Sequence, residues 1–202
     1  MTSAEGGRLG RLAAGPGERV RGMVRVPGIE PAWEMPAWIV RGREEGPRLV
    51  VTAGVHAAEY PPIEAAVRFA RALDPEEVRG TVVVVTLVNA PGFFERSLYV
   101  NPRDGQNLNR CFPGAPDGPP SARVADFVLQ DVIRDADAYL DLHCGDLVEA
   151  LEPFAMYRLT GDQHLDARAD RLARAYGIRH LIVSEDGVPG SAVGAAAEIG
   201  VP

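Results

Sequence analysis

Short apolar blocks alternate along this chain with stretches of helical periodicity. Four blocks rich in Val, Ile and Trp and bounded by Gly or Pro predict strands over 20–26, 36–41, 48–53 and 81–88. The last block, TVVVVTLV, is apolar at consecutive positions, which indicates a central strand covered on both faces. Apolar residues at helical spacing then predict a helix after Pro62, with Ile63, Ala66, Val67, Ala70 and Leu73 on one stripe.

The second half of the chain continues the alternation. A stretch that is polar at its centre, from Asn89 to Pro120, predicts a long loop of the kind that often carries function. Ser121 then predicts the N-cap of a helix, and ADAYLDLH predicts a strand that ends at His143. Further strands are expected at 153–159 and HLIVS, with helices along the Leu165–Tyr176 stripe and over 191–199.

Strands that alternate with helices predict one α/β domain, with a mostly parallel or mixed central sheet and helices on both faces. We expect this domain to cover residues 20–202, after a flexible segment 1–19 rich in Gly, Arg and Ala.

The amino-acid composition of the chain argues against several classes of protein. The net charge of -7 argues against a nucleic-acid partner, and no apolar run reaches the roughly 18 residues of a membrane helix. The chain start has no apolar core of a signal peptide, so we expect a cytoplasmic protein. Two cysteines are too few for a disulfide framework, and all 21 basic residues are arginine, which excludes a Schiff-base lysine.

Histidine and glutamate follow the predicted strand LVVTA in the sequence GVHAAE. His56 and Glu59 are three positions apart, so one turn can bring both side chains to the same face. His143 ends another predicted strand, and the carboxyl ends of strands in an open α/β sheet gather into one site. Two histidines and a carboxylate leave a fourth position for water, which is typical of catalytic zinc. The alternatives are hydrogen-bonded core histidines, or ligation by His164 or His180 instead.

The predicted loop contains the stretch NPRDGQNLNRCFPG, residues 101–114. Arg103, Asn107, Asn109 and Arg110 lie within eight positions in it. One interpretation is a solvated polar turn, which Asp-Gly and Pro-Gly pairs favour. The other is a set of guanidinium and amide donors for a substrate carboxylate and a developing oxyanion.

Taken together, GVHAAE, NPRDGQNLNRCFPG and DLHCG, in this order, resemble the succinylglutamate desuccinylase/aspartoacylase family of the zinc carboxypeptidase-like superfamily. The resemblance covers roughly residues 45–202. It implies a zinc carboxypeptidase-like fold and one Zn²⁺ per chain, held by His56, Glu59 and His143. It also implies that Asn109 and Arg110 bind a substrate carboxylate and that Arg103 polarises the scissile carbonyl.

The resemblance further implies a glutamate general base on a strand after the last helix. Glu198 is the tempting match, but 191–199 is predicted as helix, with Gly200 as its C′ residue and Val201-Pro202 as the step into a strand. We therefore expect the true base beyond residue 202, an incomplete domain and poor hydrolysis by this chain, with Glu198 as the fallback.

Two residues close to His143 in the sequence, Cys144 and Asp141, each have two possible roles. Cys144 is either a nucleophile or metal ligand, or a buried thiol, and the absence of a visibly paired base favours the thiol. Asp141 lies on the same strand face as His143, where it either orients that histidine or has a capping or solvent-facing role.

The expected function is a zinc-dependent amide hydrolase, a deacylase acting on small N-acyl amino acids or related amides. The alternatives are a zinc carboxypeptidase for short peptides and a zinc-binding module without turnover. The sequence leaves open the acyl group, the amine half of the substrate and the oligomeric state.

Overall fold

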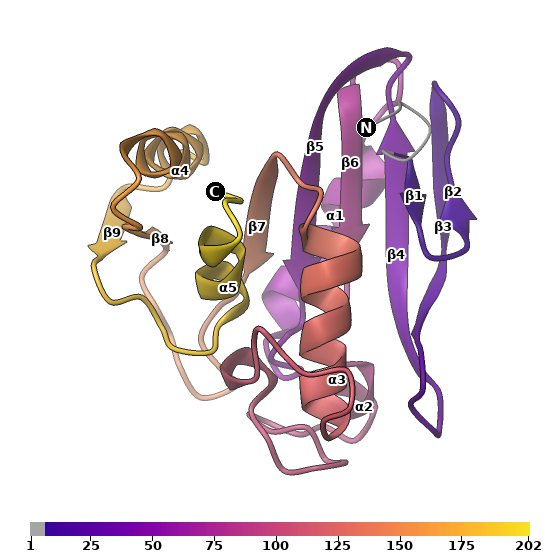
Figure 1. The fold of residues 1–202 in the computed structure, drawn as a ribbon, viewed down its shortest axis with the longest axis vertical. Coiled ribbons are helices and arrows are strands. Elements are labelled where there is room, and N and C mark those ends of the chain that lie inside the picture. Colours follow the sequence, from indigo (N-terminus) through magenta and orange to yellow (C-terminus); the bar gives the residue numbers. More distant parts are fainter. Residues whose placement is uncertain (1–6) are drawn as a thin grey trace.

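The computed structural model describes residues 7–202, and its centre is a five-stranded mixed sheet (Figure 1). The strand order is β3-β4-β6-β5-β7. β4 is antiparallel to both β3 and β6, whereas β5 is parallel to β6 and β7. The strands span Glu18–Val26 (β3), Trp33–Arg41 (β4), Glu44–Ala53 (β5), Arg79–Val85 (β6) and Ala138–Leu142 (β7).

Helices cover both faces of this sheet, as predicted, because the side chains of its central strands alternate between two cores. Val51 and Val84 pack with Ala66 and Ala70 of helix α1 (Tyr60–Ala72). On the other face, Val50 and its neighbours pack against α3 (Pro120–Phe127) and the π-helical η2 (Val128–Ile133). The apolar strand β6 is thus buried on both sides, as its uninterrupted valines indicated.

A second, two-stranded parallel sheet stands apart from the first (Figure 1). It contains β8 (Phe154–Arg158) and β9 (His180–Ser184), which are joined through helix α4 (Gln163–Ala175). Helix α5 (Ala192–Glu198) contacts both β7 and β8. The chain leaves α5 through Gly200 at φ +84°, the predicted C′ residue, and the N–H of Tyr139 donates to the carbonyl of Pro202 at 2.9 Å.

The amino-terminal segment differs from the expected flexible stretch. Strands β1 (Arg8–Leu9) and β2 (Leu12–Ala13) form a hairpin, and Leu9 is only 2% exposed. The physical reason is that Leu9 belongs to the same core as the inner residues of β3 and β4, which offsets the loose composition around it. Residues 1–6 of the predicted flexible segment lie outside the described residues.

The long loop after β6 contains more regular structure than its sequence indicated. It includes α2 (Ala90–Phe94) and the 3-10 helix η1 (Leu108–Arg110). Ser121 is not the N-cap of α3, because the cap position is Pro119 and Ser121 is fully buried within the first turn. The carboxylate of Asp104 does the capping instead, accepting from the Ser121 N–H at 2.7 Å and from its hydroxyl at 2.9 Å.

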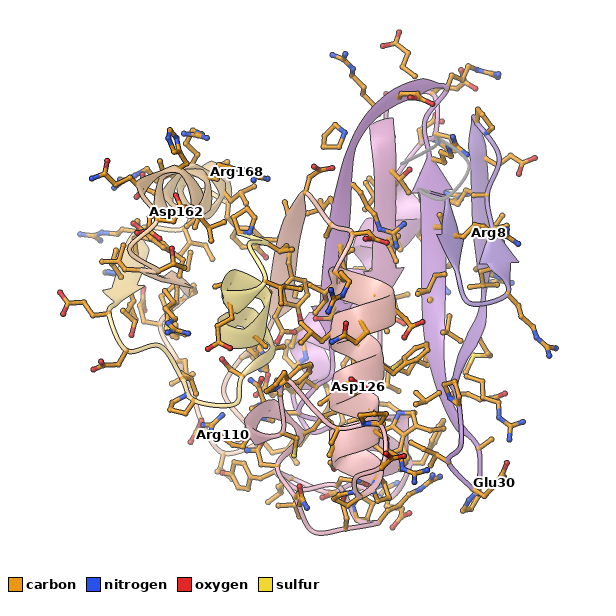
Figure 2. All side chains as sticks on the ribbon, in the orientation of Figure 1. Arg8, Glu30, Arg110, Asp126, Asp162 and Arg168 are labelled. Carbon is orange, nitrogen blue, oxygen red and sulfur yellow. The ribbon has the colours of Figure 1, made fainter. Side chains whose placement is uncertain are left out.

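Charged side chains project from the outside of the elements, as Arg8, Glu30, Asp162 and Arg168 show in Figure 2. Within residues 7–202, no helix combines the length and apolar character needed to cross a membrane.

Candidate metal centre

His56 and Glu59 lie in the tight turn that links β5 to α1. Gly54 begins this turn at φ +66°, and a Cβ there would lie 2.8 Å from Leu87 Cδ1, so glycine is required for both conformation and space. Glu59 is the N-cap residue of α1, and a proline fills one of the first helical positions, where an N–H would have no intrahelical partner. The turn therefore holds both side chains at the carboxyl end of β5.

His143 reaches the same place from the neighbouring strand. It directly follows β7, whose Leu142 is the register partner of Ala53 in β5. One Glu59 oxygen lies 2.7 Å from His56 Nδ1, and the other lies 2.9 Å from His143 Nδ1. The candidate ligand atoms of all three residues lie within 4.8 Å of one another, so this His–Glu–His group can hold a metal ion.

Glu59 is only 4% exposed, and the groups around it shift its pKa and that of His143. Burial raises the pKa of Glu59, but hydrogen bonds from His143, His56 and the Cys144 N–H outweigh burial and bring the pKa to about 2. Burial lowers the pKa of His143, but the charge and hydrogen bond of Asp141, together with Glu59, raise it to about 10. The two carboxylates thus create a site of negative potential that favours a cation at His143 Nδ1.

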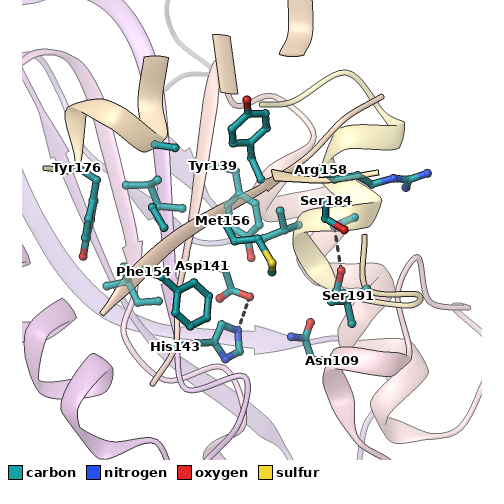
Figure 3. A pocket seen from close by; sticks show the side chains of 18 of the residues that line it. Asn109, Tyr139, Asp141, His143, Phe154, Met156, Arg158, Tyr176, Ser184 and Ser191 are labelled. Carbon is teal, nitrogen blue, oxygen red and sulfur yellow. Dashed lines mark hydrogen bonds and ion pairs between the residues drawn. The ribbon is translucent and has the colours of Figure 1, made fainter. Parts of the chain in front are cut away.

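Each histidine has an acceptor behind its other nitrogen. His143 Nε2 lies 2.9 Å from Asp141 Oδ2 (Figure 3), and His56 Nε2 lies 3.1 Å from Asn107 Oδ1. The same Asn107 oxygen accepts from the Asn109 N–H at 2.9 Å, which identifies it as the oxygen of the amide. With a proton on each Nε2, the Nδ1 atoms are the ones that would bind a metal in place of the protons that they donate to Glu59.

Two cavities meet at His143. The first, of about 540 Å³, lies between β7 and β8 and is also lined by His56, Asn109 and Arg110 (Figure 3). The second, of about 520 Å³, is lined by Asp146, Glu149 and Glu152, and by no arginine of residues 7–202. His143 therefore lies between a cavity lined by Arg110 and a cavity lined by three acidic residues.

Asn109 and Arg110 are brought to this site, as the sequence predicted. The Asn109 side-chain oxygen accepts from the Ala192 N–H at the start of α5 at 2.9 Å. Its NH₂ group points toward His143 (Figure 3). Arg110 is exposed, and its guanidinium donates to the Asn109 carbonyl at 2.7 Å, so its other N–H groups are available at the cavity wall.

Arg103 and Glu198 are not brought to the His–Glu–His group. The Arg103 guanidinium donates to the Pro31 carbonyl at 2.6 Å and stacks 5.4 Å from the centre of the Trp33 ring. Glu198 pairs with Arg158 at 3.1 Å on the exposed side of α5. Neither residue lines the two cavities beside His143.

The competing residues also lie elsewhere or have other partners. His164 is exposed in the first turn of α4, and His180 lies 3.8 Å from Glu152 at the start of β9. Cys144 donates its thiol to the Gly145 carbonyl, and burial together with the Glu59 charge raises its pKa. A protonated thiol is a poor nucleophile, which favours the buried-thiol interpretation.

Sequence reasoning assigned no role to Asp146. It is 9% exposed, and its Oδ1 has no hydrogen-bond partner. Burial and the charge of Glu59 raise the pKa of Asp146. Its position three residues after His143 was the only signal, and an acidic residue in a loop is common without a role.

The model of the succinylglutamate desuccinylase/aspartoacylase catalytic domain matches residues 45–202. The chain belongs to this family. An N-alpha-acetyl-L-2,4-diaminobutyric acid deacetylase of Halomonas elongata is 35% identical over 157 residues, covering 76% of this chain and 45% of the relative. The family member from Rhodobacter sphaeroides has 31% identity and a TM-score of 0.81, over 91% of this chain and 55% of that chain.

Two further solved structures share the fold of this chain. The product-bound ectoine utilization protein EutE (DoeB) of Ruegeria pomeroyi matches with a TM-score of 0.81 and 26% identity, over 91% of this chain and 57% of that chain. Carboxypeptidase A of Helicoverpa armigera matches with a TM-score of 0.65 and 13% identity, over 91% and 58%. The second match shows the fold alone, and it confirms the predicted carboxypeptidase-like architecture. The chain spans about half the length of these relatives.

Proposed function

We propose that this chain supplies the metal ligands and the carboxylate-binding residues of a zinc-dependent deacylase that hydrolyses N-acyl amino acids. The observation that carries the proposal is the convergence of His56, Glu59 and His143 from two adjacent strand ends, with all ligand atoms within 4.8 Å. Two imidazoles and one carboxylate are the donor set of catalytic zinc sites. Bound there, zinc would lower the pKa of a water molecule and polarise the acyl oxygen.

The chain's own residues would bind and orient the substrate. Asn109 and Arg110 line the first cavity beside His143, and a guanidinium fork with an amide donor suits the carboxylate of an amino acid. Arg103 would have to leave both Pro31 and Trp33 before it reached an acyl oxygen. We therefore assign Arg103 no substrate contact in this conformation.

We propose that the general base is a residue other than Glu198. The Glu198 carboxylate is engaged with Arg158, and Glu198 itself lines neither cavity beside His143. A base must come within hydrogen-bond reach of the attacking water. The relatives are about twice as long as the part matched here, so they have further chain that can supply such a group.

Among N-acyl amino acids, we propose a substrate whose amine half carries a second, free amino group. The deacetylase of Halomonas elongata acts on a diaminobutyric acid derivative, and this chain places Asp146, Glu149 and Glu152 along the second cavity. Carboxylates attract an ammonium group and repel an acidic side chain. The acidic wall therefore favours an N-acyl diamino acid over an N-acyl aspartate or glutamate.

Zinc content tests the ligand assignment. We expect about one zinc per purified chain, loss of that zinc in His143→Ala, and retention in the matched control His164→Ala. Loss of zinc from the His164 variant with retention in the His143 variant would overturn the site.

Binding measurements separate the deacylase from its alternatives. Calorimetry on the zinc-loaded chain should show binding of N-acetyl-2,4-diaminobutyrate and weaker binding of its carboxamide. Arg110→Ala should remove this difference, and Arg110→Lys should not restore it, because lysine lacks the bidentate fork. Preferential binding of dipeptides would support the carboxypeptidase, and binding of zinc without any of these ligands would support a zinc-binding module.

A further inference from the structure

A line of hydrogen bonds extends from His143 into the sheet. Asp141 Oδ2 lies 2.9 Å from His143 Nε2, and Asp141 Oδ1 accepts from the Thr52 hydroxyl at 2.6 Å. The Thr52 oxygen in turn lies 2.7 Å from the Tyr139 hydroxyl. Thr52 is 0% exposed, Tyr139 is 5% exposed, and the Asp141 side chain is 1% exposed, so water does not compete for these bonds.

The register of the sheet builds this line. Thr52 of β5 is the register partner of Asp141 of β7, which places the two side chains next to each other. Tyr139, Asp141 and His143 are two residues apart, so their side chains point to the same face of the strand. A shift of one residue in the β5–β7 pairing would break both contacts that Thr52 makes across the two strands.

Proton counting gives the line a single direction. The Asp141 carboxylate can only accept hydrogen bonds, so the Thr52 hydroxyl donates its single proton to Asp141. The Thr52 oxygen must then accept from the Tyr139 hydroxyl. Burial and the charge of Asp141 raise the pKa of Tyr139 above its ordinary value, which keeps this donor protonated. The other Asp141 oxygen accepts from His143 Nε2–H. Nδ1 would then bind a metal once the proton that it donates to Glu59 has left.

His56 is held in a different way. Its Nε2 faces the neutral amide of Asn107, in the long loop. Each Nε2 thus has an acceptor, but at this nitrogen His56 meets a neutral amide, whereas His143 meets a carboxylate that is itself bonded to two buried hydroxyl groups in sequence.

We propose that Tyr139, Thr52 and Asp141 are positioning residues of the metal centre, which fix the ring orientation and tautomer of His143. This inference rests on the proposed zinc site. This relay of Tyr139, Thr52 and Asp141 acts through the proton on His143 Nε2 and the direction of the Nδ1 lone pair.

Zinc affinity of isosteric variants tests the relay. We expect Asp141→Asn to weaken zinc binding about tenfold to a hundredfold, because the amide cannot both accept from Nε2–H and replace the lost charge. Thr52→Val should weaken it severalfold, and Tyr139→Phe less. Thr86→Val is the matched control, because it removes a similarly buried threonine hydroxyl, which donates to the Pro36 carbonyl away from His143. Affinity is measured by chelator competition on variants that circular dichroism shows to be folded.

A second readout separates positioning from general destabilisation. In the zinc-loaded protein, the His143 Nε2–H should give a slowly exchanging imidazole proton signal in ¹H–¹⁵N spectra. Thr52→Val should shift this signal and hasten its exchange, whereas Thr86→Val should leave it unchanged. Thr52→Val should also add little to the loss in zinc affinity caused by Asp141→Asn, because both act through one bond.

The outcomes are distinguishable. Failure of the unaltered chain to bind zinc would overturn the proposed function and, with it, the relay. Zinc binding by the unaltered chain, with Thr52→Val and Asp141→Asn binding as tightly as Thr86→Val, would overturn the relay alone. Should Asp141→Asn not fold, Thr52→Val and Tyr139→Phe decide the question, since both preserve side-chain shape.

Discussion

Glu59 is the residue on which the centre depends, because its two oxygens face the two histidines separately. Oε1 faces His56, and Oε2 faces His143 and the Cys144 N–H. Removing the carboxylate would leave two imidazoles and one backbone N–H without their acceptor in a largely buried place. Glu59 therefore organises the turn after β5 and the end of β7 together.

The proton on His143 Nδ1 gives zinc binding a pH dependence. In the metal-free protein the pKa of His143 is about 10, so this proton is present at neutral pH and must leave before Nδ1 can bind a metal. We expect zinc affinity to rise with pH, about tenfold per unit if one proton is released, throughout the range below that pKa. Chelator competition between pH 6 and 8.5 measures the slope. A flat profile would contradict displacement of this proton.

For single residues, sequence patterns predict the position along the fold better than the direction of the side chain. His56, Glu59 and His143 follow strand ends, and the backbone alone brings strand ends together. Arg103 lies in the same polar loop as Arg110, but the buried Trp33 ring and the Pro31 carbonyl hold its guanidinium away from the cavity. Neither partner is close to Arg103 in the sequence, so no local pattern could have predicted its direction.

Among the elements, the loop between β6 and α3 shows how distant residues set a helix terminus. Pro119 is the cap position of α3 but has no side-chain acceptor, and Asp104 provides one from fifteen positions away. Asn101 adds a hydrogen bond from its amide to the Ser121 hydroxyl at 2.9 Å. The sequence placed the helix start within two residues, but it could not show which side chain satisfies the first turn.

Replacing Asp104 tests this contribution. We expect Asp104→Ala to lower the free energy of unfolding by about 1–2 kcal/mol, the usual effect of removing a capping acceptor. Asp117→Ala, at an exposed position of the same loop, is the matched control and should have little effect. Urea denaturation of both variants gives the difference, and equal stability of the two would show that the Asp104 contacts contribute nothing.

For the whole molecule, the sequence predicted the alternation of strands and helices but not the separation of the two sheets. Periodicity shows which residues a strand buries, whereas pairing depends on which edges meet in space. β8 pairs with β9, and within the described residues β7 pairs with β5 as its one partner strand. The first cavity is lined by residues of both β7 and β8 and of α5, which contacts both strands.

That open edge of β7 should be visible in amide hydrogen exchange. Because the Tyr139 N–H points away from β5, toward Pro202, the Asp141 N–H points the same way, while those of Leu140 and Leu142 point toward β5. We expect the Leu140 and Leu142 amides to exchange slowly and the Asp141 amide to exchange much faster, although all three lie in one strand of the central sheet. Equal protection along β7 would contradict an open edge. The strand that carries the candidate ligand His143 would then be held by β5 along one edge while its amides exchange with water along the other.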